Sequence, residues 1–178
     1  MSDYFLGLGS NLGDRAEMLS FGVARLPGVL RSSSIYISSP LEMEASADDF
    51  LNLVVEVEFA GDPYQLLRIV QSIENEAGRL RPYRNAPRSL DIDLIYSAGV
   101  EIESPDLVLP HPRARRRLFV LVPLAELDPG AASTLAGFDF SLHDFRAGRY
   151  AKIYPGQYLK RYSGPGEVLS YHRPTAAD

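Results

Sequence analysis

The order in which two hydrophobic periodicities follow one another constrains this chain more than any other feature of its sequence. Four strand-like segments are either continuously apolar or alternate between apolar and polar residues. In two other segments, apolar residues recur at helical spacing. The strand-like segments are residues 4–8, 29–38, 50–59 and 90–96, and the helical segments are residues 15–26 and 62–78. In chain order they run strand, helix, strand, strand, helix, strand. This order predicts an α+β fold, a ferredoxin-like α/β sandwich with a mainly antiparallel sheet.

The C-terminal part of the chain departs from this pattern. Residues 113–124 are predicted to hold a last helix, which Pro123 closes. Residues 148–174 are rich in Tyr, Gly and Pro without a clean period, so the pattern leaves open whether they form strands. With 178 residues, the chain suits a single hydrophobic core. We therefore expect a domain over residues 1–136 and a C-terminal extension, residues 137–178, that packs on this domain or continues it.

The distribution of charge limits the class of ligand. The net charge of −5 argues against the basic field of a nucleic-acid-binding protein, so we expect no nucleic-acid partner. The arginines nevertheless form two clusters, a pattern that favours a small polyanion as the ligand. One cluster is Arg79, Arg81, Arg84 and Arg88, and the other is Arg113, Arg115, Arg116 and Arg117.

The absence of cysteine bears on compartment and chemistry. It excludes disulfides, thiolate metal sites and cysteine nucleophiles, and it fits a reducing compartment. The first residues show no signal peptide, and no apolar run is long enough to span a membrane. We expect a cytoplasmic protein without membrane contact and, by default, a monomer.

Asp91 and Asp93 are the most informative pair in the sequence. In a strand, residues two apart project from the same face, so both carboxylates point one way while Ile92 and Leu94 point to the core. Adjacent carboxylates repel each other unless a cation lies between them, and Mg²⁺ prefers oxygen ligands of this kind. The alternative is a strand face on which two acidic residues simply contact water.

Arginines beside the two aspartates favour the metal interpretation. Arg79, Arg81 and Arg88 precede the aspartates in a loop that enters the same strand. Guanidinium groups match phosphate oxygens with a planar fork of donors. Carboxylates for a metal next to arginines for phosphate are the usual pairing in phosphoryl-transfer sites.

His111 and the second arginine cluster each allow two interpretations. His111 stands between two prolines, where it either hydrogen-bonds a phosphate or caps a helix. Arg117 lies one helical turn beyond Arg113, so both would face one direction. The alternative for this run is a solvated basic helix face.

Two further patterns are weaker. Gly7-x-Gly9 superficially resembles a dinucleotide-binding loop but lacks the third glycine at the required spacing, so it is interpreted as part of a tight strand-to-helix turn. Gln71 and Glu74 lie three residues apart and are predicted to share a face near the end of the second helix. Such a polar pair usually lies on the surface.

Several of these segments occur together, in the same order, in one enzyme family. They are Gly9-Ser10-Asn11-Leu12-Gly13, Phe50-Leu51-Asn52, Gln71-x-x-Glu74, Gly78-Arg79-x-Arg81, Ala86-Pro87-Arg88-x-x-Asp91-x-Asp93 and Leu109-Pro110-His111-Pro112. On these residues the chain resembles the 6-hydroxymethyl-7,8-dihydropterin pyrophosphokinase family over most of residues 4–128. The stretch from Ala86 to Asp93 is highly specific to that family.

The resemblance implies an enzyme that transfers diphosphate from ATP, its co-substrate, to 6-hydroxymethyl-7,8-dihydropterin and releases AMP, a step in folate synthesis. It implies two Mg²⁺ ions, with Asp91 and Asp93 as their ligands. The implied catalytic residues are Arg79, Arg88, Asp91 and Asp93. The implied ATP-binding residues are Gln71, Glu74, Arg81, His111 and Arg117. The implied pterin-binding residues are Ser38, Ser39, Leu41, Phe50, Asn52 and Phe119.

Two other functions compete with this interpretation. A member of the family that binds pterin or nucleotide without turnover would not require the pair Asp91 and Asp93. A ferredoxin-like RNA-binding module would carry aromatic residues at alternate positions of its central strands and a basic surface. Leu51, Leu53 and Val55 occupy such positions here, and the chain is acidic, so both features argue against RNA binding.

Overall fold

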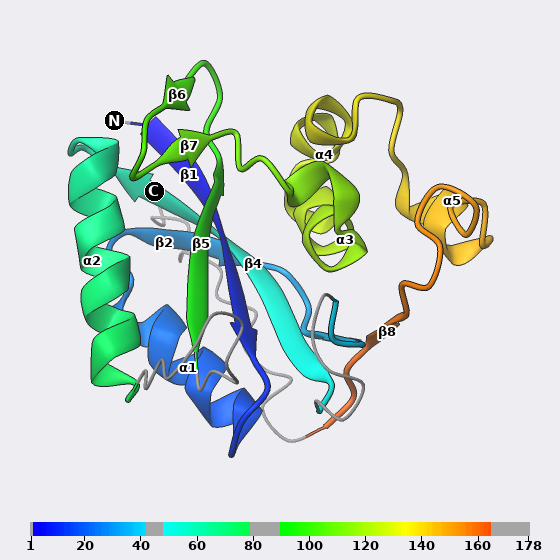
Figure 1. Cartoon of the computed structure of the whole chain (residues 1–178), viewed down its shortest axis with the longest axis horizontal. Coiled ribbons are helices and arrows are strands. Elements are labelled where there is room, and N and C mark those ends of the chain that lie inside the picture. The colour runs from blue at the N-terminus through cyan, green and yellow to red at the C-terminus, as the bar shows by residue number, and fades with distance from the viewer. Residues whose placement is uncertain (1, 42–47, 79–89, 165–178) are drawn as a thin grey trace, which may run out of the picture.

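A computed structural model describes residues 2–41, 48–78 and 90–164 of the chain. Its main sheet has six strands, and every pairing in it is antiparallel. The strands are β1 (Ser2–Ser10), β2 (Val29–Ser32), β3 (Tyr36–Ser38), β4 (Phe50–Phe59), β5 (Asp91–Tyr96) and β8 (Leu159–Arg161). They run in the order β5-β1-β4-β3-β8, and β2 also pairs with β4 (Figure 1). A separate hairpin joins β6 (Ile102–Glu103) to β7 (Val108–Leu109).

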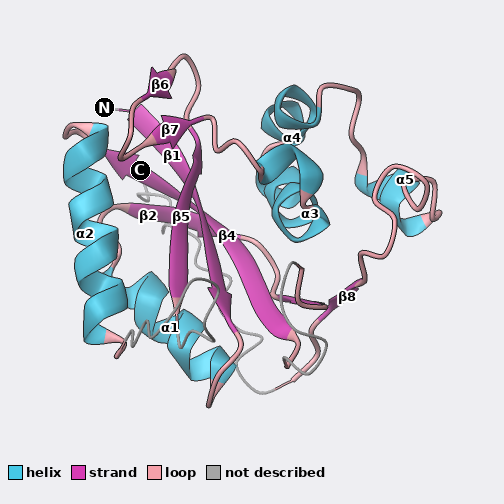
Figure 2. Ribbon diagram, in the orientation of Figure 1, coloured by secondary structure: helices cyan, strands magenta, loops and turns pink. Residues whose placement is uncertain are grey.

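Helices cover both faces of this sheet, as Figure 2 shows. Those on one face are α1 (Arg15–Arg25) and α2 (Pro63–Glu76), and those on the other are α3 (Leu118–Leu127) and α4 (Pro129–Ala136), with α5 (Leu142–Arg146) beyond them. A 3₁₀ turn, η1 (Ala114–Arg116), precedes α3. The predicted ferredoxin-like α/β sandwich with a mainly antiparallel sheet is confirmed. No helix in the described part of the chain is long and apolar enough to cross a bilayer.

Local sequence signals explain where the first two helices begin. The Asp14 side chain accepts a hydrogen bond from the backbone N–H of Glu17, which caps α1. The helix α2 has a capping box, in which Asp62 and Gln65 each accept a backbone N–H at its start, and Pro63 occupies its first position. These caps support the two helices that pack against the sheet behind the site.

The central strand β4 is buried on both faces because helices lie on both sides. Leu51 and Leu53 pack with α1 and α2 in one core, whereas Val54 packs with α3 and α4 in a second core. Even Asn52 and Glu56 are less than a tenth exposed. A strand at this place in the sheet therefore presents its polar side chains to an enclosed space rather than to open solvent.

Two boundaries differ from the prediction. The strand expected over residues 29–38 is two strands, β2 and β3. At Ser33 the backbone N–H donates to the Val54 carbonyl, but the Val54 N–H donates to the Ser33 side-chain oxygen instead of to a backbone carbonyl, and this interrupts the regular ladder. The helix expected over residues 113–124 was wrong at both ends. A 3₁₀ turn replaces its start, and Pro123 lies inside α3 instead of closing it. Burial of α3 against the sheet compensates for the one helical hydrogen bond that Pro123 cannot make.

Residues of the C-terminal extension reach the sheet edge. The strand β8 pairs with β3, and Ser38 lies opposite Leu159. Four aromatic rings of the extension pack against one another and against α3 and α4; they belong to Phe138, Phe140, Tyr150 and Tyr154.

Candidate active site

Two glycines of β1 form the floor of a cleft between β4 and β5. Gly9 pairs with Asn52 on one side and with Asp91 on the other, and Gly7 pairs with Asp93. Residues paired in this way project from the same face of the sheet. A Cβ atom on Gly9 would lie 3.2 Å from the Oδ1 atom of Asn52. The absence of side chains here therefore leaves an open path from Asn52 to the two aspartates.

The cleft encloses about 940 Å³, part of which is open solvent. Its walls come from β1, β3, β4 and β5 and from the segment that includes η1 and the start of α3. It is lined by Gly7, Leu8, Gly9, Ser38, Ser39, Leu41, Phe50, Asn52, Leu53, Asp91, Asp93, Ile95, Arg113, Arg117, Phe119 and Val120. A concave site lined by apolar and aromatic side chains together with a few polar groups suits small-molecule ligands.

One end of the cleft combines aromatic surface with a buried amide. Asn52 is 5% exposed, and its Nδ2 atom donates to the hydroxyl oxygen of Ser38, 2.9 Å away. Phe50 and Phe119 both line the cleft. An amide in a cleft that aromatic rings also line suits a flat heterocycle that carries its own donors and acceptors.

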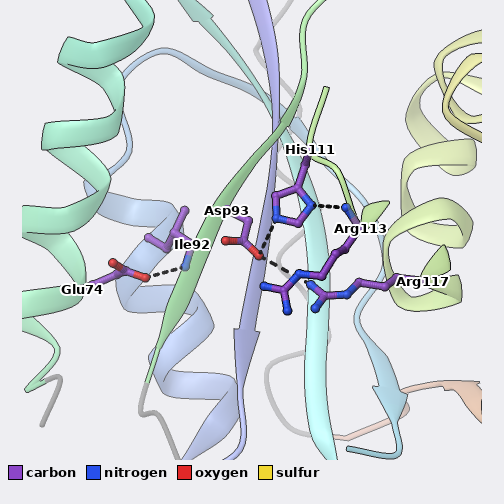
Figure 3. Close-up of polar contacts among 6 residues, drawn as sticks. All are labelled: Glu74, Ile92, Asp93, His111, Arg113 and Arg117. Carbon is purple, nitrogen blue, oxygen red and sulfur yellow. Dashed lines mark hydrogen bonds and ion pairs between the residues drawn. The ribbon is translucent and has the colours of Figure 1, made fainter. Parts of the chain in front are cut away.

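The other end holds the two carboxylates, and Figure 3 shows that of Asp93 beside nitrogen atoms of His111 and Arg117. The Oδ2 atom of Asp93 lies 3.9 Å from Nε2 of His111 and 4.0 Å from Nη1 of Arg117. The guanidinium of Arg117 also lies 5.4 Å from the ring centre of Phe119. Arg117 therefore stands where the acidic pair meets the aromatic wall. The alternation predicted for β5 is confirmed, because Ile92 and Leu94 are each 4% exposed and belong to the core.

The protonation state of His111 follows from its surroundings. Its Nδ1 atom accepts a hydrogen bond from the backbone N–H of Arg113, 3.2 Å away. In neutral histidine, the ring nitrogen that does not accept carries the proton, so Nε2–H points toward Asp93. Burial, reinforced by the charges of Arg117 and Arg113, lowers the pKa of His111 to about 4, although Asp91 opposes the shift. The imidazole is neutral near pH 7 and carries its proton on Nε2.

Glu74 supports β5 from behind the cleft. Its carboxylate is buried, and Oε1 accepts the backbone N–H of Ile92 at 3.0 Å (Figure 3). Gln71, in contrast, is exposed, so the two residues do not share one environment as the sequence pattern suggested. Neither residue lines the cleft. Glu74 therefore acts on the strand between Asp91 and Asp93.

The carboxylate pair has the chemistry that Mg²⁺ requires. Both aspartates face the cleft and both offer hard oxygen ligands, and the Asp93 side chain is 39% exposed, so water reaches it. Within the described residues, no group of three or more His, Cys, Asp or Glu side chains is arranged so that it could hold a metal ion. A metal held by Asp91 and Asp93 would thus complete its coordination with water or substrate oxygen, as Mg²⁺ commonly does at phosphate sites.

The structure brings together nine of the predicted site residues in one cleft. They are Ser38, Ser39, Leu41, Phe50, Asn52, Asp91, Asp93, Arg117 and Phe119. His111 reaches it through Asp93. Arg79, Arg81 and Arg88 lie outside the described residues. Sequence reasoning missed the floor at Gly7 and Gly9, for which the signal was two glycines at alternate positions of a strand.

Comparison with known proteins places this cleft in a family. The family model for 7,8-dihydro-6-hydroxymethylpterin-pyrophosphokinase matches residues 5–129, which is more than half of the chain. The chain belongs to this family. The 2-amino-4-hydroxy-6-hydroxymethyldihydropteridine pyrophosphokinase of Bacillus subtilis is 44% identical over 128 residues, covering 69% of this chain and 76% of that protein. The protein of the same name from Methylorubrum extorquens is 42% identical over 134 residues, covering 72% and 84% of the two chains.

Solved structures show the same fold at lower sequence identity. The wild-type HPPK-DHPS of Plasmodium falciparum, solved with STZ-DHP, aligns with a TM-score of 0.59 at 13% identity over 86% of this pyrophosphokinase-family chain. Another HPPK-DHPS structure, in complex with substrates, aligns with a TM-score of 0.61 at 13% identity over 90% of this chain. The chain spans about half the length of these solved proteins, 44% and 48% respectively.

Proposed function

We propose that this pyrophosphokinase-family protein transfers the diphosphoryl group of ATP to 6-hydroxymethyl-7,8-dihydropterin, with release of AMP, in a Mg²⁺-dependent reaction of folate synthesis. The observation that carries the proposal is the glycine floor. It joins Asn52 and its aromatic neighbours to Asp91 and Asp93 within one cleft. A flat acceptor and a polyphosphate donor would therefore lie end to end.

The proposed acceptor end is built around Asn52. Its amide would hydrogen-bond the polar edge of the pterin, while Phe50 and Phe119 would lie against the ring and Ser38, Ser39 and Leu41 would line the rest of the pocket. Because Asn52 is buried, a ligand without matching polar atoms would leave its amide partly unpaired. This cost disfavours such ligands and selects for the pterin edge.

The proposed donor end is built around the aspartates. Asp91 and Asp93 would hold two Mg²⁺ ions, which supply neutralisation and alignment of the phosphate oxygens when bound. Arg117 and the Nε2–H of neutral His111 would donate to the same phosphates. Arg81 and Gln71 are proposed ATP contacts, and Arg79 and Arg88 are proposed to stabilise the charge on the transferred group.

Glu74 is proposed to act through β5. Its hydrogen bond to Ile92 holds the backbone between the two aspartates, and burial behind the sheet separates it from a nucleotide in the cleft. Its contribution to ATP binding would therefore be the placement of Asp91 and Asp93.

In the proposed reaction, the hydroxymethyl oxygen of the pterin attacks the β-phosphorus of ATP. The bond between that phosphorus and the oxygen bridging to the α-phosphate breaks, and this oxygen leaves with AMP. The hydroxyl proton passes to solvent. Positioning and charge neutralisation would supply most of the rate, since little covalent chemistry is asked of the protein.

We also propose the organisation and setting of the protein. Residues 1–136 are proposed as the pyrophosphokinase domain, and residues 137–178 as an extension that continues the same domain, which the pairing of β8 with β3 supports. A cytoplasmic monomer is proposed, and the absence of cysteine is consistent with a reducing compartment.

The test is a product assay. The protein is mixed with ATP, Mg²⁺ and 6-hydroxymethyl-7,8-dihydropterin, and nucleotides are quantified with and without the pterin. AMP that forms only with pterin, without ADP, is the expected result. Formation of ADP in place of AMP, or formation of AMP at the same rate with and without the pterin, would contradict diphosphoryl transfer to the pterin. Chelation of the divalent metal with EDTA should stop the reaction, and added Mg²⁺ should restore it.

A further inference from the structure

The C-terminal extension contacts the backbone of the segment that carries Arg117. The hydroxyl of Tyr154 donates to the carbonyl oxygen of Arg115, 3.1 Å away. The Nε2 atom of Gln157 donates to the next carbonyl, that of Arg116, at 2.6 Å. Carbonyls at the end of a short helical turn have no partner within the turn, so the extension satisfies two that would otherwise rely on water.

Gln157 also caps the helix that follows. Its Oε1 atom accepts the backbone N–H of Leu118 at 2.9 Å. Leu118 is the first residue of α3, and the N-cap residue, Arg117, makes no side-chain capping hydrogen bond. A capping acceptor that α3 lacks locally thus comes from a residue 39 positions later in the chain.

The two hydrogen bonds of Gln157 lie on either side of Arg117 in the chain. One holds the carbonyl of the residue before it, and the other holds the N–H of the residue after it. The backbone of Arg117 is therefore fixed from both sides by a single amide. Its guanidinium lines the cleft and lies 4.0 Å from Asp93.

The position of Gln157 is itself determined by the sheet. Two residues later, Leu159 begins β8 and pairs with Ser38 of β3, and the Tyr162 N–H donates to the Ile35 carbonyl at 2.8 Å. Ser38 in turn accepts a hydrogen bond from the side chain of Asn52. The extension therefore contacts both the side of the cleft that contains Asn52, proposed to bind the pterin, and the side that contains Arg117. In Figure 1 this part of the chain leaves α5 and reaches the sheet at β8.

From this arrangement, the geometry points to Gln157 as a positioning residue of the active site, which presets Arg117 toward the phosphates of ATP. The inference rests on the proposed function. It assigns a role to residues beyond the 5–129 matched by the family model.

The first test replaces Gln157 with leucine, an apolar side chain that is one bond shorter and makes neither of the two hydrogen bonds. We expect kcat/KM for ATP to fall about tenfold, because misplacement of a group by about 1 Å can cost up to about a hundredfold. The matched control is Gln65→Leu, which removes a side-chain hydrogen bond to a helix N-terminus at α2, away from the cleft. This control should lower the melting temperature and leave kcat/KM unchanged. Equal activity of wild type and Gln157→Leu would overturn the inference.

A double-mutant cycle separates positioning from general stability. If Gln157 acts through Arg117, Gln157→Leu should change kcat/KM for ATP by less than about twofold in an Arg117→Ala background, because the two residues are coupled. An equal loss in both backgrounds would mean that Gln157 acts by another route and would overturn the inference.

A second substitution guards against loss of the folded state. Gln157→Glu keeps the acceptor for Leu118 and replaces the donor to Arg116 with a carboxylate oxygen that the Arg116 carbonyl repels, so the Leu118 amide should remain protected from hydrogen exchange while the contact with Arg116 is lost. We expect a loss of at least about threefold in kcat/KM, smaller than for leucine, that again disappears with Arg117→Ala. A loss that persists in that background overturns the inference. The two proposals fail differently, since an inactive wild type contradicts the proposed function, whereas an unaffected variant of an active wild type contradicts the role of Gln157.

Discussion

The carboxylate of Glu74 accepts a hydrogen bond from the backbone N–H of Ile92, the residue between the two aspartates of β5. Two successive outward side chains of the strand form the acidic pair, and the intervening N–H is held from the helix α2. A buried contact between helix and strand thereby determines where both carboxylates lie in the cleft.

Removal of this contact should destabilise the protein. In Glu74→Ala the buried N–H of Ile92 loses its partner, which typically costs about 1–3 kcal/mol. Chemical denaturation should show this loss in the free energy of unfolding. Gln71→Ala, an exposed change on the same helix, should alter it by less than about 0.5 kcal/mol. A Glu74→Ala protein as stable as wild type would show that this hydrogen bond contributes little.

Asp93→Ala should abolish transfer and leave the fold intact. The substitution removes a proposed metal ligand, and several kcal/mol of lost charge stabilisation corresponds to about a thousandfold in kcat. It also relieves repulsion between Asp91 and Asp93, so the melting temperature should not fall. Asp3→Ala, at an exposed carboxylate of β1, is the control and should be fully active. Near-normal turnover by Asp93→Ala would contradict the metal assignment.

His111 should contribute a specific pH dependence to stability. Its pKa is about 4 in the folded protein, below the ordinary value of 6.5. Between these values the unfolded chain binds a proton that the folded chain does not, so stability should fall as the pH falls from 6.5 toward 4. Above pH 6.5 this residue adds no slope.

Two measurements check the state of His111. Denaturation at a series of pH values should show that His111→Gln loses this part of the slope and keeps the rest. Nitrogen NMR of the ligand-free protein should find the proton on Nε2, because Nδ1 accepts from Arg113. An imidazole that titrates near its ordinary pKa, or carries its proton on Nδ1, would contradict the geometry.

Asn52→Ala should weaken pterin binding selectively. Loss of hydrogen bonds to a buried amide corresponds to about 1–3 kcal/mol, or about 5- to 150-fold in Kd. Fluorescence titration with the pterin, in the presence of Mg²⁺ and a non-hydrolysable ATP analogue, would measure it. The Kd of the ATP analogue alone should change little, because Asn52 lies at the other end of the cleft from Asp93. Equal weakening of both ligands would contradict the separation into two ends.

Gly9→Ala should obstruct the floor of the cleft. Its Cβ atom would lie 3.2 Å from Oδ1 of Asn52, so the Asn52 side chain must shift by a few tenths of an ångström, whereas 3.7 Å from Cδ1 of Phe50 is an ordinary van der Waals contact. We expect kcat/KM for the pterin to fall about tenfold through this displacement. Gly130→Ala places a Cβ atom at a similar 3.2 Å from the Asp128 carboxylate, in α4, and should leave turnover unchanged. If Gly9→Ala left kcat/KM for the pterin unchanged, the absence of a side chain at Gly9 would not be required for activity.

Much of this site could be predicted because it depends on local rules. The period-two pattern of β5 placed Asp91 and Asp93 on one face, and the helical spacing over residues 62–78 predicted the helix α2. The interpretation of Gln71 and Glu74 as one surface pair did not hold, because spacing on a helix does not reveal which side faces a neighbouring strand.

The sequence by itself therefore determined the order of elements, the acidic pair and the motifs that place the chain in its family. These depend on residues close together in the chain. The tertiary structure alone decided that Gly7 and Gly9 form the open floor between Asn52 and the aspartates, that Glu74 accepts a hydrogen bond from the backbone of β5, and that Gln157 caps α3. Each of these is a contact between segments far apart in sequence. The sheet register and the path of the extension create them, and no local periodicity records either.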